Sequence, residues 1–135
     1  MVKQLQYRHH RGLDSRLREV GTSLAQWDAL RAISRRPGAS AHALAEMTFQ
    51  SDQSFGSLAK RLRKRGLIDR IEGPGRAVHH RLTPAGEAVL EKGYAATAAV
   101  LEASFRPLSP RQRQDLSRLI SRALVGGDPQ QRVGL

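Results

Sequence analysis

The stretch KRLRKRGLIDRIEGPGRAVHHRLTPAG, which runs from Lys60 to Gly86, joins a cationic segment to a pattern typical of two short strands. LIDRIE and VHHRL contain β-branched residues and partly alternate apolar with polar positions. Gly73-Pro74-Gly75 lies between them and supplies turn residues. The pattern therefore predicts a β-hairpin with Arg76 at its tip, and Gly66 suits the end of a preceding helix.

The segment before Gly66 has the spacing of an amphipathic helix, and Ser51 or Asp52 can cap its start. Its apolar residues follow an i, i+3, i+4, i+7 pattern and share one face: Phe55, Leu58, Ala59 and Leu62. The opposite face is polar and cationic and carries Gln53, Ser57, Lys60, Arg61 and Lys64. A charged stripe is most simply a solvated helix face. The neighbouring segments of the chain therefore decide whether a DNA-binding role is favoured instead.

Those neighbours form the pattern of a helix-turn-helix. Ser40 can cap a short helix, AHALAEM, and Thr48-Phe49-Gln50 is a three-residue linker to the cationic helix. In this motif the second helix enters the major groove of DNA with its N-terminal residues at base edges. The following hairpin would make a winged helix, whose Arg76 is sized for a narrow minor groove; a solvated turn arginine is the alternative. The expected DNA contacts are Ser51, Gln53, Ser54, Ser57, Lys60, Arg61 and Lys64 from the helix and Arg70, Arg76 and His79 from the wing.

The net positive charge of the chain favours a polyanionic binding partner. The 135 residues are enough for one domain, and 23 Lys plus Arg against 12 Asp plus Glu give a net charge of +11. The positive excess gathers in residues 1–18, 51–81 and 106–135. The apolar runs are too short for a bilayer span and the first residues lack a signal-peptide core, so we expect a cytoplasmic protein with no membrane partner.

No enzyme chemistry is indicated by the motifs. Cysteine is absent, which excludes disulfides, thiol catalysis and Cys-ligated zinc. The five histidines, at His9-His10, His42 and His79-His80, do not form an HExxH-type pattern, and no nucleophile motif or phosphate-binding glycine loop is present. We therefore expect no catalytic residue, no metal ligand and no cofactor. On the wing strand, one of His79 and His80 should point to the core and the other to solvent or phosphate.

SLAQWDAL, ALAEM, LAKRLRKRGLIDR and RLTPAGEAVL occur in order between Ser23 and Leu90. This series resembles the MarR-type (multiple antibiotic resistance regulator) winged-helix transcription factors. The resemblance implies a mainly α (α+β) fold, a winged helix-turn-helix with long N- and C-terminal dimerisation helices. It also implies a homodimer that binds a pseudo-palindromic operator in double-stranded DNA. The sequence departs from many members at two positions: Pro74 replaces an Asp that would steady Arg76, and Ser57 replaces a base-contacting Arg.

The terminal segments are helical in pattern. Leu13, Leu17 and Val20 predict a first helix that ends near Gly21, and a helix from Pro84 to Phe105 is interrupted by Pro107. After Ser109-Pro110, a last helix carries an apolar stripe of Leu116, Leu119, Ile120, Ala123 and Leu124. The resemblance implies that these helices interlock between two subunits, whereas packing within one chain is the alternative. The expected organisation is a dimerisation region at 1–22 and 86–125, a winged helix at 23–85 and a disordered tail at 126–135.

The resemblance further implies a small phenolic or aromatic ligand in a crevice between the dimer helices and the DNA-binding lobe. Tyr7, His10, Arg11 and Trp27 are the nearest candidates, although Trp27 also fits a plain core position. The resulting prediction is a sequence-specific transcriptional repressor that a ligand releases from DNA. Two alternatives stay open: an architectural protein that coats DNA without sequence preference, and a metal-responsive regulator, since some relatives sense zinc.

Overall fold

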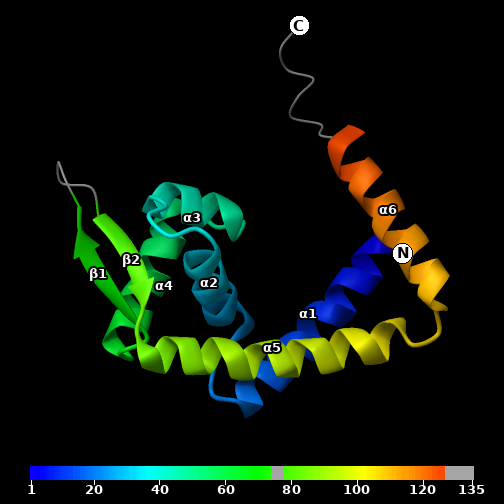
Figure 1. Cartoon of the computed structure of the whole chain (residues 1–135), viewed down its shortest axis with the longest axis horizontal. Helices are drawn as coiled ribbons and strands as arrows, with labels where there is room; N and C mark the ends of the chain where they lie inside the picture. The colour runs from blue at the N-terminus through cyan, green and yellow to red at the C-terminus, as the bar shows by residue number, and fades with distance from the viewer. Residues whose placement is uncertain (74–77, 127–135) are drawn as a thin grey trace, which may run out of the picture. The chain divides into compact units, whose positions relative to one another are not determined.

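A computed structural model describes residues 1–73 and 78–126 of the chain. Within these residues the elements are α1 (Val2–Glu19), α2 (Leu24–Arg35), α3 (Ala41–Met47), α4 (Asp52–Lys64), β1 (Ile68–Glu72), β2 (Val78–Leu82), α5 (Pro84–Phe105) and α6 (Pro110–Gly126) (Figure 1). The predicted mainly α winged helix-turn-helix fold is confirmed. None of the described helices has the length and hydropathy that a bilayer span requires. The chain divides into two compact units, unit 1 (Met1–Val100) and unit 2 (Leu101–Leu135).

Serine caps fix the starts of α2, α3 and α4. Ser23 accepts a hydrogen bond from the backbone N–H of Gln26, and Ser40 accepts one from Ala43, each at 3.1 Å. Ser51, and not Asp52, caps α4 by accepting from the N–H of Ser54 at 3.1 Å. A side-chain oxygen that satisfies an unpaired N–H typically stabilises a helix start by about 1 kcal/mol.

The core of unit 1 draws on α1, α2, α3, α4, β1 and the part of α5 that lies in unit 1. Its largest fully buried side chains are Leu17, Leu30, Leu44, Phe55, Leu62 and Ile68. The apolar face predicted for α4 is confirmed, because Phe55, Leu58, Ala59 and Leu62 are all buried. This face sets the rotation of α4 about its axis, so the opposite, polar face must point outward.

Trp27 ties α2 to α5. Its indole is buried, Nε1 donates a hydrogen bond to the Leu90 carbonyl at 3.1 Å, and the ring meets Tyr94 edge to face at 5.3 Å between centroids. Gly93 makes this approach possible, since a Cβ there would lie 2.0 Å from Nε1 of Trp27. Trp27 is therefore a core residue.

The wing is an antiparallel hairpin held firmly at its base. β1 pairs with β2 in a register that places Ile68 opposite Leu82 and Glu72 opposite Val78. At the open end of the hairpin, the Thr83 hydroxyl donates to the Gly66 carbonyl at 2.6 Å and the Thr83 N–H donates to the Leu67 carbonyl at 3.0 Å. Residues 74–77, which include the predicted tip residue Arg76, lie outside the described residues, as do residues 127–135 of the predicted tail.

Unit 2 contains the last turns of α5 and all of α6. Helix α6 begins at Pro110, after the break that Pro107 predicts, and it buries none of its residues. The predicted apolar stripe is present but lies at the surface: Leu119 is 57% exposed and Leu124 is 74% exposed. Unit 2 therefore presents an amphipathic helix whose apolar side has no cover within the described chain.

Candidate nucleic-acid interface and terminal groove

The N-terminal half of α4 presents hydroxyl and amide groups to solvent. Ser51, Gln53, Ser54 and Ser57 are all exposed. A shallow groove of about 360 Å³ runs along this face and is lined by Ala25, Gln50, Gln53, Ser54, Ser57, Leu58 and Arg61. Amides and hydroxyls both donate and accept hydrogen bonds, as recognition of base edges requires. Sequence reasoning missed Gln50 and Ala25; the place of Gln50 directly before the cap of α4 was the available signal.

The C-terminal half of α4 and its C-cap residue are cationic, and two sets of these cations have different surroundings. Lys60, Arg61 and Lys64 are exposed, and no carboxylate among the described residues forms an ion pair with them. Arg65 is used internally, because its guanidinium donates to the side chain of Gln26 and to the Gly21 carbonyl. The first set is available to phosphates, while Arg65 fastens the end of α4 to α2 and to the segment before α2.

On the wing, Arg70 is exposed and lies opposite His80 in the β1–β2 register. His80 is buried and packs against Phe55 of α4 with 6.4 Å between ring centroids. Burial lowers the pKa of His80, and the nearby charges of Arg63 and Arg70 lower it further. His80 is thus the core-facing histidine that the strand pattern predicts. His79 is half-buried, and Nδ1 of each ring is buried without a hydrogen-bond partner among the described residues.

A polar link between α3 and α4 was not foreseen from the sequence. Nδ1 of His42 lies 2.8 Å from Oδ1 of Asp52, and Nε2 lies 3.1 Å from Oε1 of Glu46. The hydrogen bond with Asp52, then the charges of Asp52 and Glu46, raise the pKa of His42. When protonated, this side chain bridges two carboxylates and joins the two helices of the helix-turn-helix.

The four residues considered for a small ligand are only partly brought together. The Arg11 guanidinium lies 5.8 Å from the centre of the Tyr7 ring, and both side chains are exposed, as is His10. Trp27 is enclosed in the core, and the Arg31 guanidinium lies 5.8 Å from its ring. Across residues 1–73 and 78–126, no group of three His, Asp or Glu side chains is placed to hold a metal ion.

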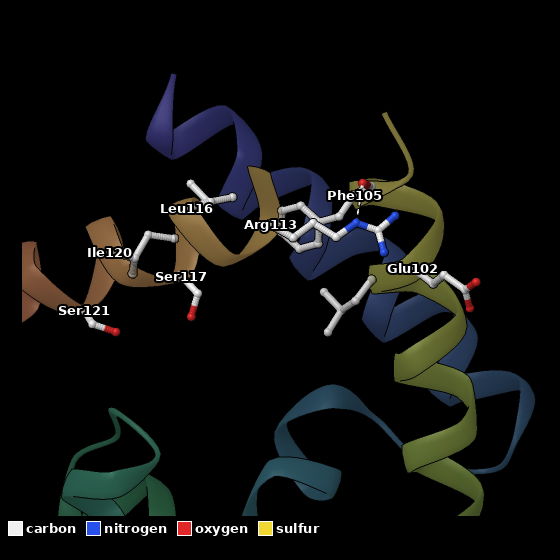
Figure 2. A pocket seen from close by; sticks show the side chains of 8 residues that line it. Glu102, Phe105, Arg113, Leu116, Ser117, Ile120 and Ser121 are labelled. Carbon is white, nitrogen blue, oxygen red and sulfur yellow. Dashed lines mark hydrogen bonds between the residues drawn. The ribbon is translucent and has the colours of Figure 1, made fainter. Parts of the chain in front are cut away.

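Unit 2 contains an apolar groove of about 430 Å³ between the end of α5 and α6 (Figure 2). Leu101, Phe105, Leu116 and Ile120 form its apolar part, while Glu102, Arg113, Ser117 and Ser121 complete the lining. Nε of Arg113 donates to the Phe105 carbonyl at 3.1 Å, which fixes the turn that joins the two helices. Sequence periodicity predicted the α6 side of this groove but not the part played by Phe105.

The family model of the MarR family matches residues 20–77, the span from the end of α1 to the wing. The chain carries a MarR-type winged helix. A comparison with curated proteins found no significant match.

Solved structures resemble this chain over most of its length. A probable transcriptional regulator from Pseudomonas aeruginosa is 29% identical, with a TM-score of 0.77, and the match covers 90% of this chain and 92% of that one. A mutant MarR from E. coli, solved in complex with operator DNA, is 19% identical with a TM-score of 0.81, covering 91% and 90%. A MarR family protein from Mycobacterium tuberculosis, solved with p-aminosalicylic acid, is 21% identical with a TM-score of 0.77, covering 90% and 93%.

Proposed function

We propose that this protein is a sequence-specific DNA-binding transcriptional regulator that reads the major groove with α4. The observation that carries the proposal is the division of α4 into a fully packed apolar face and an exposed face of amides, hydroxyls and cations. The first face fixes the helix rigidly, and the second supplies groups suited to DNA. The E. coli relative solved with operator DNA supports this reading.

The side chains of α4 and the wing divide into two roles in this proposal. Gln53, with Ser51, Ser54 and Ser57 beside it, lies near the N-terminus of α4 and reads base edges; an amide can bond adenine at two positions. Lys60, Arg61 and Lys64 meet phosphates, which fix the position of the protein but carry no sequence information. From the wing, Arg70 and His79 approach the backbone, and Arg76 enters the minor groove.

The regulator acts as a homodimer through residues 1–22 and 86–125. The exposed stripe of α6 and the apolar groove of unit 2 support this part of the proposal, because an uncovered apolar surface of this kind marks an interaction site. Dimerisation presents two copies of the winged helix at residues 23–85, one to each half of a pseudo-palindromic operator in the cytoplasm.

Repression and its release complete the proposed cycle. A small aromatic acid binds near Tyr7, His10, Arg11 and Trp27 and releases the dimer from DNA. The M. tuberculosis relative solved with p-aminosalicylic acid supports this class of ligand. The exposed Tyr7–Arg11 pair offers a cation and an aromatic face, which suit a carboxylate and a ring respectively.

A non-specific architectural DNA-binding protein is the second candidate, and the net charge of +11 favours it. Selection of duplexes from a random pool separates the two functions. A regulator enriches one discrete sequence that resists competitor DNA in a gel shift, whereas a coating protein retards every duplex alike.

Two matched variants then assign the roles on α4. Lys60→Ala should weaken binding to the selected duplex and to random DNA equally, and should lower the salt slope by about one unit. Gln53→Ala should instead lose about 1–3 kcal/mol of discrimination at one base pair. An unchanged sequence preference in Gln53→Ala would contradict its place at a base edge.

A further inference from the structure

Phe49 occupies an unusual position in the turn between α3 and α4. Its side chain is 96% exposed, and its φ of 56° makes it the only non-glycine residue with positive φ in the described parts of the chain. The turn is closed by two backbone hydrogen bonds, from Phe49 N–H to the Glu46 carbonyl at 3.1 Å and from Gln50 N–H to the Ala45 carbonyl at 2.9 Å. This pair of bonds is the Schellman motif, and Phe49 stands at the position that usually holds glycine.

The other helix ends in unit 1 provide an internal comparison. Gly21 after α1, Gly38 after α2 and Gly66 after α4 all adopt positive φ, at 89°, 80° and 74°. At those ends the chain uses the residue that pays no steric penalty for this conformation. Only after α3 does it use a side chain, whose Cβ is strained against the following carbonyl group.

The phenylalanine ring does not compensate for this strain by packing. A side chain that is almost fully exposed buries no apolar area, so glycine would serve the fold better here. A single exposed apolar residue is ordinary by itself, but one that also strains the backbone is not. The two unfavourable features together indicate a role outside the folded chain.

The surroundings of Phe49 identify the chemistry of its contact. The next residue, Gln50, lines the groove on α4 together with Gln53 and Ser54, and Ser51 caps the helix. Phe49 therefore lies at the N-terminal end of the face proposed to read bases. In a major groove the apolar feature available to a phenyl ring is the 5-methyl group of thymine.

We propose that Phe49 is a specificity residue, whose ring contacts the 5-methyl group of a thymine at the edge of the sequence read by α4. The inference rests on the proposed function, since it needs α4 to lie in the major groove. It adds an aromatic contact to the polar and cationic contacts proposed for the exposed side chains of α4.

Deoxyuridine tests this contact because it differs from thymidine only by the missing methyl group. The probe is the duplex that the wild-type protein selects from a random pool, with each thymidine replaced in turn. Fluorescence anisotropy gives Kd for the wild type, Phe49→Gly and Phe49→Ala. Replacement of the contacted thymidine in a single half-site should weaken wild-type binding about fourfold, the factor expected for burying one methyl group. Both variants should bind the unmodified duplex at least about fourfold more weakly and ignore that replacement.

Melting temperatures distinguish the effect of the phenyl ring on DNA binding from the effect of the positive φ on stability. Phe49→Gly should melt at or above the temperature of the wild type and above Phe49→Ala, because only glycine relieves the positive φ. Equal binding by wild type and Phe49→Gly, or a deoxyuridine effect that persists in Phe49→Gly, would overturn the inference while leaving the proposed function intact. If the wild type selects no discrete sequence, the proposed function fails and this inference fails with it.

Discussion

The two units of the chain differ in the exposure of their leucine side chains. Leu30 and Leu62 of unit 1 are fully buried, whereas Leu119 and Leu124 of α6 in unit 2 are 57% and 74% exposed. Helices α2, α4 and α6 are all amphipathic, so the spacing of apolar residues alone does not distinguish α6 from the other two. The difference is that α2 and α4 bury their apolar faces against other elements, whereas α6 buries none of its residues among the parts of the chain that the structure describes. The winged helix thus packs its apolar side chains within the described chain, while the apolar side of α6 stays at the surface.

The largest expected effect comes from matched leucine truncations in the two units. Leu30→Ala should lower the free energy of unfolding by about 2–5 kcal/mol, since it leaves a cavity in a packed core. Leu124→Ala should change the unfolding of unit 1 by less than about 0.5 kcal/mol, yet weaken self-association. The only tryptophan, Trp27, reports the unfolding of unit 1 in urea. Equal losses in both variants would remove the distinction between the units.

A glycine pair sharpens the comparison within unit 1. Gly93→Ala drives a methyl group to 2.0 Å from Nε1 of Trp27 and should destabilise the protein by about 1–3 kcal/mol. Gly56→Ala in α4 meets nothing within 4 Å and should stabilise it by about 0.5–1 kcal/mol. Urea midpoints at one fixed protein concentration measure both changes. A neutral Gly93→Ala would show that the contact between α2 and α5 is loose.

The smallest effects concern the dependence of stability on pH, and they should have opposite signs for His80 on β2 and His42 on α3. His80 has a lowered pKa, so the unfolded chain takes up its proton first and stability falls as pH drops below about 6.5. His42 has a raised pKa, so its contribution is present below about 6.5 and is lost as pH rises through the raised value.

Urea unfolding at pH 5.5 and 7.5 measures these contributions. His80→Phe should reduce the loss of stability on acidification, while His42→Asn should enlarge it slightly. A pH dependence that neither substitution alters would assign it to other groups.

Local sequence patterns predicted much of this molecule and failed at identifiable points. The caps at Ser40 and Ser51 and the buried face of α4 could be predicted because each depends on residues within one or two turns of the chain. The close approach of Gly93 to Trp27 joins positions far apart in sequence, which periodicity does not report. The strain at Phe49 was missed as well, because a linker position reveals its φ only in the folded backbone.

The candidate site divides in the same way. The outward direction of Gln53 and Lys60 followed from helical spacing, since the apolar face of α4 had to be buried. The bridge from His42 to Asp52 and the internal use of Arg65 could not be predicted, because both depend on how α3, α4 and the segment before α2 meet. Charge counting treats Arg65 and Lys60 alike, although Arg65 is hydrogen-bonded within the chain and Lys60 forms no ion pair among the described residues.

Sedimentation of the protein bound to its selected duplex tests the central claim most directly, because it counts the chains on one DNA molecule. The account predicts a discrete complex that contains twice the 14.9 kDa of one chain. Its two copies of α4 should contact half-sites about one helical turn, roughly 34 Å, apart. A complex with a single chain, or a number of bound chains that grows with the length of the duplex, would contradict it.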